Sequence, residues 1–290
     1  MSVERNQKFH NAYITADKYE LQRLWEEESP PSLTKFFPAT YASNGTNYFL
    51  DHLENKTLWL SSPEFFNDPL DCVYNFDYYG EARQLAEAVI KDLPVDDSMK
   101  QLLNSARFQE SFTDLVGRYQ STLLKTHSRL EHSQYVSCFS EVENIYSKRM
   151  WAHYANAHKG VCAEYEFDSV NQICTVGCIP VIYTDAYNRT PQTETTHDEV
   201  AELLKLVYNK AMEWKYEKEW RVVQQSEDVK NGLTLPCPLP KKIYLGCKVE
   251  KKLKLDVLTF CAGTEIEVFQ MKLIPGSFNL GFEQYIFPKM

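Results

Sequence analysis

Hydrophobic and polar positions follow two different periods along the chain, and these periods predict helices and strands in separate blocks. Apolar residues such as Leu21 and Leu24 recur every three to four positions in residues 17–28, which predicts a short amphipathic helix ended by a Ser-Pro-Pro turn. The same spacing continues from about residue 81 to residue 128 and predicts a helical hairpin. Further helices are predicted at residues 146–156, 198–215 and 250–260.

Alternation with a period of two predicts the strands. It is clearest in residues 160–167, where Val161 and Tyr165 alternate with Glu164 and Glu166. Strands are predicted at residues 33–37, 57–61, 134–140, 160–167, 179–183, 219–225, 242–246, 265–271 and 282–287. Because most strands follow one another through loops, the pattern predicts an α+β fold with mixed, mostly antiparallel sheets and a helical insertion.

Length and composition favour one domain. The 290 residues are 43% hydrophobic, which is enough to fill one core near the upper size limit. We therefore predict a single α+β domain over residues 1–290 with the helical insertion at about 81–128, and two closely packed lobes as the alternative. The amino end lacks a signal-peptide pattern and no run of about 18 apolar residues occurs, so we expect a cytoplasmic protein with no membrane partner.

Charge and cysteine content narrow the function classes. The net charge of −9 argues against nucleic-acid binding over a broad basic face, so nucleic acid is expected only through a local groove. The candidate basic residues for such a groove are Lys148, Arg149, Lys241 and Lys242. The eight cysteines mostly lie in apolar runs, and Cys174 and Cys178 have no second pair at zinc-finger spacing. We therefore expect reduced cysteines and no structural metal.

Residues 214–221 bring carboxylate, cationic and aromatic side chains close together in the sequence. At strand spacing, Glu217, Glu219 and Arg221 share one face. Two neighbouring carboxylates raise each other's pKa or require a cation between them, and Arg221 is predicted to be that cation. The alternative is a structural salt-bridge ladder without a ligand.

Two polar turns or strand ends could contribute to a pocket beside these carboxylates. Ser137 and Ser140 lie near the end of a predicted strand, where a hydroxyl can hold a ligand or cap a turn. Asn67 and Asp68 precede a proline, so an Asx-type turn is their default role. A functional role for this turn requires Asp68 or Asp71 to point into a cleft shared with Glu219.

The segment Met-Trp-Ala-His-Tyr-Ala at residues 150–155 adds aromatic and titratable side chains. On a helix, Trp151 and Tyr154 lie on one side and either fill a core or form a pocket wall. His153 is a candidate proton carrier, although a structural histidine is the commoner case.

Several of these segments, taken in order, resemble the bacterial family called domain of unknown function 2971. The segments are residues 33–36, 58–63, 66–71, 136–140, 150–155, 159–160, 181–183 and 215–221. The Met-Trp-Ala-His-Tyr-Ala and Tyr-Glu-Lys-Glu-Trp-Arg stretches are the most specific. The resemblance covers residues 33–287 and implies no function by itself.

A second resemblance does imply one. Mono-ADP-ribosyltransferases of the Arg-Ser-Glu class present a basic residue on an early strand, a Ser-x-Ser strand and a Glu-x-Glu pair. Lys35, residues 137–140 and residues 217–219 are similar in order, with lysine in place of arginine and one extra residue between the serines. The resemblance implies NAD as the cofactor, with an acceptor, small or macromolecular, that the sequence does not identify.

The same resemblance implies residue roles. Glu219 would stabilise the oxocarbenium-like ribose and Glu217 would orient the acceptor. The expected contacts to the cofactor are Lys35 on the pyrophosphate, Ser137 or Ser140 on the nicotinamide ribose, and Trp151 or Tyr154 on a ring, with Arg221 as a further cofactor-binding residue. Glu219→Ala is expected to stop NAD consumption with little loss of stability.

Two other functions are compatible with the sequence. Asp68 together with Glu213 and Lys215 could hold Mg²⁺ in a metal-dependent nuclease. Alternatively, the aromatic residues could form a partner groove in a non-enzymatic sensor or protein-interaction module.

Overall fold

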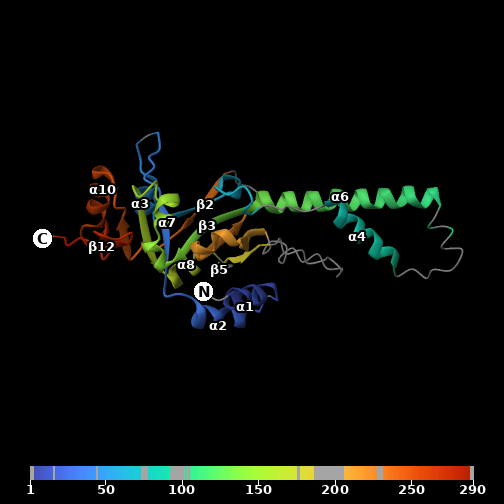
Figure 1. Ribbon diagram of the computed structural model, residues 1–290, viewed down its shortest axis with the longest axis horizontal. Coiled ribbons are helices and arrows are strands. Elements are labelled where there is room, and N and C mark those ends of the chain that lie inside the picture. The colour runs from blue at the N-terminus through green and yellow to red at the C-terminus, as the bar shows by residue number, and fades with distance from the viewer. Residues whose placement is uncertain are drawn as a thin grey trace.

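The computed structural model describes residues 3–15, 17–43, 45–72, 78–91, 101, 103, 105–174, 177–185, 206–226 and 231–287 (Figure 1). The helices are α1 (Val3–Ile14), α2 (Lys18–Glu28), α3 (Tyr48–Asn55), α4 (Tyr78–Lys91), α6 (Ala106–Ser133), α7 (Lys148–Tyr154), α8 (Phe167–Asn171) and α10 (Lys251–Cys261). Three short 3₁₀ helices are η1 (Pro63–Phe65), η2 (Val142–Tyr146) and η3 (Met212–Glu217).

The strands form one large sheet and one small sheet. They are β1 (Ser32–Phe37), β2 (Thr57–Ser61), β3 (Gln134–Glu141), β4 (Val161–Glu166), β5 (Cys178–Pro180), β6 (Ile182–Thr184), β7 (Asn209–Ala211), β8 (Glu219–Gln225), β9 (Gly232–Pro236), β10 (Lys242–Leu245), β11 (Glu267–Leu273) and β12 (Leu280–Gln284). Among the described strands, β10 with β11 and β6 with β7 pair in parallel and the other pairs are antiparallel. The predicted α+β fold with a mixed, mostly antiparallel sheet is therefore confirmed.

The large sheet forks at β3. One edge of β3 pairs with β8 along its length, up to Ser140 opposite Glu219. The other edge pairs with β1 only near Ser140, opposite Thr34, and with β2 only at Val136. Between these two contacts neither β1 nor β2 pairs with residues 137–139, so the two strands diverge and leave an opening in the sheet.

Helices α1 and α2 cover the sheet beside β5 and β8 (Figure 1). Phe9 of α1 packs edge-to-face on the buried Trp220 of β8, with ring centroids 5.5 Å apart. Trp25 of α2 donates from Nε1 to the Cys178 carbonyl of β5 at 3.1 Å. This packing holds β8 in place from the face opposite the one that carries Glu219 and Arg221.

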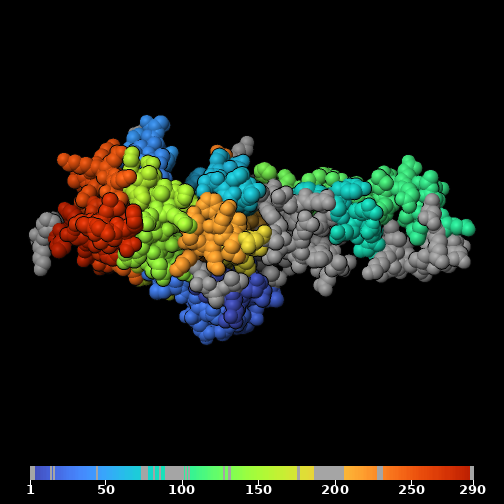
Figure 2. Space-filling view, in the orientation of Figure 1, coloured from blue at the N-terminus to red at the C-terminus, as the bar shows by residue number. Residues whose placement is uncertain are grey.

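Helices α4 and α6 pack against each other and project away from the sheet (Figures 1 and 2). Their contact is a small apolar cluster that includes Ala82, Ala86, Val116 and Leu123. Helix α6 runs directly into β3 at Gln134. The helical pattern expected at about 81–128 therefore corresponds to two helices that extend a few residues beyond it at either end.

Most predicted strands are confirmed, but one predicted helix is wrong. The helix expected at 198–215 is α-helical only at residues 206–208 within the part that the structure describes, and residues 198–205 lie outside it. Residues 209–211 instead form β7, which pairs with β6, and η3 follows. Backbone pairing with β6 outweighs the local helical pattern.

The elements α1, α3, α8, β9 and η1 were not predicted. All eight cysteines are free, as expected for reduced thiols. None of the helices in the described ranges combines the length and the apolar composition that a membrane crossing requires.

Candidate functional site

A cavity of about 960 Å³ occupies the fork between β1 and β2. Side chains from β1, α3, β2, β3, α7 and the turn after η1 line it, together with Lys210, Glu217 and Glu219 at one end. Its volume lies near the upper end of the range for small-molecule sites, about 300–1,000 Å³. The cavity can therefore hold a large organic ligand.

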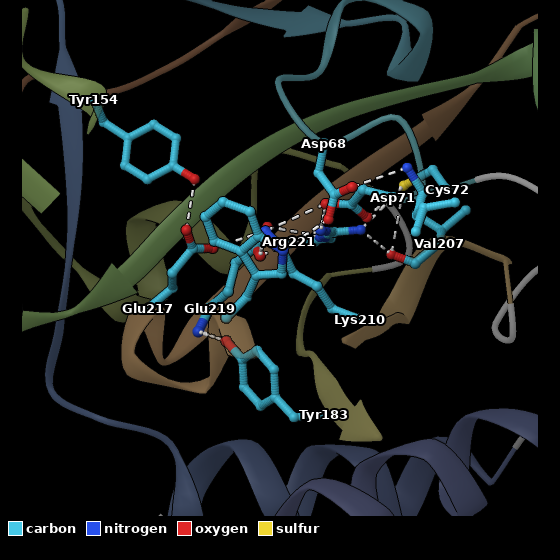
Figure 3. A network of polar contacts seen from close by, with 12 residues as sticks. Asp68, Asp71, Cys72, Tyr154, Tyr183, Val207, Lys210, Glu217, Glu219 and Arg221 are labelled. Atoms are coloured by element: carbon cyan, nitrogen blue, oxygen red, sulfur yellow. Dashed lines mark hydrogen bonds and ion pairs between the residues drawn. The ribbon is translucent and has the colours of Figure 1, made fainter. Parts of the chain in front are cut away.

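Five buried charged side chains form an ion cluster at the inner end of this cavity: Asp71, Lys210, Glu217, Glu219 and Arg221 (Figure 3). Arg221 donates from Nε to Glu219 Oε1 at 2.7 Å and from Nη2 to Asp71 Oδ2 at 2.8 Å. Lys210 Nζ lies 2.7 Å from Glu217 Oε2, 2.8 Å from Glu219 Oε2 and 3.2 Å from Asp71 Oδ2. Three carboxylates face two cations, so the fully ionised cluster carries one surplus negative charge.

The two glutamates of the ion cluster titrate in opposite directions. Burial by itself would raise the pKa of Glu219, but Arg221 and Lys210 outweigh it and hold this pKa well below its usual range. Burial raises the pKa of Glu217, and the opposing effect of Lys210 does not cancel the increase. Glu219 is therefore an ionised group at neutral pH, whereas Glu217 is the better proton acceptor.

Neighbouring groups fix the ion cluster in place. Tyr154 donates from its hydroxyl to Glu217 Oε1 at 2.5 Å, and the Glu219 amide donates to the Tyr183 hydroxyl at 2.8 Å (Figure 3). Between the two glutamates, Lys218 has a left-handed backbone with φ of 46°. This turn ends η3 and starts β8, so both carboxylates reach Lys210 although only Glu219 lies in the strand.

Lys35 is a separate cation in the middle of the cavity. Its Nζ donates to the Cys138 carbonyl at 3.2 Å, on the edge of β3 that neither β1 nor β2 covers. Its other close neighbours are the rings of Phe37 and Phe139, with centroids 5.7 and 5.4 Å away. Burial lowers the pKa of Lys35. Within the described chain no carboxylate lies within ion-pair distance of this ammonium group, so it can accept an anionic ligand.

Most predicted site residues line this one cavity. They are Lys35, Asn67, Ser140, His153, Tyr154, Glu217 and Glu219. The glutamates are held in ion pairs, as the ladder interpretation expected, yet they also border an open cavity. The two interpretations of residues 217–221 are therefore compatible with each other.

Two predicted ligand contacts are wrong because their side chains point elsewhere. Ser137 faces away from the cavity, and its buried hydroxyl has no hydrogen-bond partner. Trp151 is fully buried, donates from Nε1 to the Ile145 carbonyl at 2.7 Å and packs on Phe36. The indole therefore fills the core and cannot stack on a ligand.

Two further predicted residues lie outside the cavity lining. Arg221 is buried behind Glu219, so it is a support for that carboxylate rather than a ligand contact. Asp68 caps its own turn by accepting from the Leu70 amide, and it accepts from Trp214 Nε1 at 2.7 Å. Asp71, the other candidate in this turn, is the one that shares the cavity with Glu219.

The cation between the two glutamates is Lys210 and not Arg221 as predicted. Helical spacing around residue 210 concealed this role, since a lysine in an amphipathic helix is usually solvated. The burial of Glu219 also corrects the expectation that Glu219→Ala would cost little stability. Two cations would then remain buried without that carboxylate.

The residues proposed for a nuclease or a basic groove do not gather in one place. Glu213 and Lys215 are exposed, and no group of three or more metal-ligating side chains positioned for a metal ion occurs among the described residues. The four basic residues contact different partners: Lys148 lies over Phe278, Arg149 over Tyr216, Lys241 near Glu166 and Lys242 near Glu164.

Comparison with known proteins confirms the predicted resemblance to domain of unknown function 2971 for one region of the chain. The family model described as a protein of unknown function (DUF2971) matches residues 150–222. This range contains most of α7 and four of the five residues of the ion cluster, with Asp71 outside it. No curated protein and no solved structure matches the chain.

Proposed function

We propose that this chain, whose DUF2971 region supplies most of the ion cluster, binds NAD in the cavity and transfers ADP-ribose from it to an acceptor. One observation carries the proposal. Lys35, Ser140 and Glu219 come from the neighbouring strands β1, β3 and β8, and all three line the same cavity. Their types and order are those expected from the resemblance to mono-ADP-ribosyltransferases.

The distribution of charge along the cavity supports this ligand class. Lys35 is a cation without a carboxylate partner among the described residues, and it suits a pyrophosphate. The ion cluster offers a surplus negative charge at the inner end, which suits a positively charged ring and sugar. NAD carries phosphates and a pyridinium ring in one molecule, so it matches both ends.

The proposed reaction breaks the bond between the nicotinamide nitrogen and C1′ of the ribose. Nicotinamide leaves with the bonding electron pair, and Glu219 stabilises the positive charge that develops on the ribose. An acceptor oxygen or nitrogen then bonds to C1′ and loses its proton. Glu217 orients the acceptor and takes that proton, since its raised pKa makes it the stronger base of the pair. With water as the acceptor the products are ADP-ribose, nicotinamide and a proton.

The test is nicotinamide release from NAD, followed by chromatography, for the full-length protein and two variants. Glu217→Gln keeps the side-chain shape but removes both the surplus charge and the base, so we expect release to fall by roughly 100-fold or more. Glu166→Gln is the matched control, because Glu166 is an exposed carboxylate outside the cavity lining. It should release nicotinamide at the wild-type rate.

Equal rates for wild type and Glu217→Gln would overturn the proposal, and so would a wild-type protein that neither binds nor cleaves NAD. Thermal melting separates the other two functions. NAD should raise the melting temperature of a transferase, Mg²⁺ that of a nuclease, and neither that of an interaction module.

A further inference from the structure

The outer end of the cavity differs in character from the ion cluster. Phe37 of β1 stacks on His52 of α3, with ring centroids 5.2 Å apart, and Tyr48 of α3 and Trp59 of β2 complete an aromatic wall. His52 bonds through its ring nitrogens to the Thr57 carbonyl and the Tyr165 hydroxyl. Burial lowers the pKa of His52 to about 4, so this end carries no histidine charge at neutral pH.

Two side chains of this wall, Tyr48 and Trp59, are exposed enough to meet a ligand, and Trp59 is the one on β2. It follows the alternation of β2, in which Leu58 and Leu60 enter the core while Thr57, Trp59 and Ser61 line the cavity. The indole lies over Gly232 of β9, where an added Cβ would stand only 2.3 Å from Trp59 Cζ2. The glycine therefore gives the ring a close backbone support, and 53% of the Trp59 surface remains exposed.

Lys35 lies between the two ends. Its ammonium group is 5.7 Å from the ring of Phe37, which belongs to the aromatic wall, and it donates to Cys138 on β3. Cys138 pairs across β3 and β8 with Arg221 of the ion cluster. An extended ligand in the cavity would therefore meet the ion cluster, then Lys35, then Trp59.

We propose that the outer end is a subsite for a nucleobase and that Trp59 is its stacking platform. This inference rests on the proposed function, in which the pyridinium ring faces the ion cluster and the phosphates face Lys35. The second ring of a dinucleotide then reaches the outer end, where a neutral aromatic wall suits a planar base. Asp51, which also lines this end, offers a carboxylate to a ribose hydroxyl or an exocyclic amine.

The test is calorimetric titration of the full-length protein with ADP-ribose and with ribose 5-phosphate, which lacks the base. Base stacking on an aromatic ring contributes enough that Trp59→Leu should weaken ADP-ribose binding by roughly 5- to 150-fold. The same variant should leave ribose 5-phosphate binding unchanged. Trp59→Phe retains an aromatic face and should recover most of the affinity.

Tyr19→Leu is the control for removal of an exposed aromatic ring, because Tyr19 lies on α2 and does not line the cavity. It should bind both compounds as the wild type does. Equal ADP-ribose affinity for wild type and Trp59→Leu would overturn the subsite, as would an equal loss for both compounds.

This result is independent of catalysis. A protein that binds ADP-ribose through Trp59 but releases no nicotinamide from NAD retains the subsite and loses the proposed reaction. A protein that releases nicotinamide and whose Michaelis constant for NAD does not change in Trp59→Leu retains the reaction and loses the subsite.

Discussion

Two groups of charged side chains in this protein have similar contacts and opposite environments. In the ion cluster, Arg221 bonds to Asp71 and Glu219 at 2.7–2.8 Å with its side chain fully buried. On α2, Arg23 bonds to Glu20 at 2.6 Å and also contacts Glu27, yet 44% of its side chain is exposed. The distances alone would give both groups the same importance.

The ion cluster and the ion pairs of α2 differ in burial. Water and salt screen the exposed pairs of α2, and such pairs add little to stability. In the ion cluster each charge has lost its hydration, so it depends on its partners, and removal of one leaves the others buried and unpaired. The comparison teaches that the ion cluster is a preorganised charged surface facing the cavity, whereas α2 carries ordinary surface pairs.

The largest effect that tests this comparison is expected for Arg221→Met. It leaves Asp71 and Glu219 buried without their main cation, so we expect the free energy of unfolding to fall by about 3–5 kcal/mol. Urea unfolding at pH 7 measures it. The matched variant Arg23→Met should leave the unfolding midpoint nearly unchanged, and similar losses for both variants would contradict the comparison.

The next largest effect concerns buried histidines and the dependence of the free energy of unfolding on pH. The pKa of His52 is lowered from 6.5 to about 4 by burial, so the folded state binds this proton less readily than the unfolded state. The stabilisation is complete above pH 6.5 and is lost as the pH falls through 4, a difference of roughly 3 kcal/mol. His52→Gln should therefore lose less stability than the wild type between pH 7 and pH 4.

Urea unfolding at several pH values measures this difference. His10 is also buried with its pKa lowered to about 4, and burial lowers the pKa of His158, so the wild-type slope contains other histidines and His52→Gln should remove only part of it. An unchanged slope in His52→Gln would show that its burial does not govern the pH dependence.

The smallest effect sharpens the comparison at the edge of the ion cluster. Tyr154→Phe removes the hydroxyl that donates to Glu217 but keeps the ring in the cavity wall, so we expect a loss of roughly 1–2 kcal/mol in unfolding free energy. Tyr19→Phe on the exposed surface should cause no change. Equal results for the two variants would mean that the Tyr154 bond contributes nothing measurable.

Local patterns predicted much of the fold because they depend on neighbouring residues. The alternation of residues 160–167 predicted β4, and the three-to-four spacing after residue 81 predicted helices where α4 and α6 lie. They failed for residues 209–211, because the pairing of β7 with β6 is a contact between distant segments. Helices α1 and α3 were overlooked, although α3 has buried residues on one face and a capping Asn47 at its start.

In the candidate site, too, local patterns predicted some features, and others depended on contacts between distant segments. The period of two correctly predicted that Glu219 and Arg221 share a face, and Glu217 joins them through the turn at Lys218. The choice between Ser137 and Ser140 needed the position of β1 beside β3. Trp59 was not predicted as a ligand contact, because an exposed tryptophan in a strand has no local feature that marks a cavity.

The amino-acid sequence by itself determined the types of most elements, the α+β class and the family resemblance of residues 150–222, because periodicity and motifs are local properties. Tertiary structure decided which cation sits between the glutamates and where the cavity opens. Asp71 and Arg221 are 150 positions apart in the sequence, and the tertiary fold brings them into contact. Several distant segments together exclude water from the ion cluster. Its arginine and carboxylates therefore have a different role from the exposed arginine and glutamates of α2.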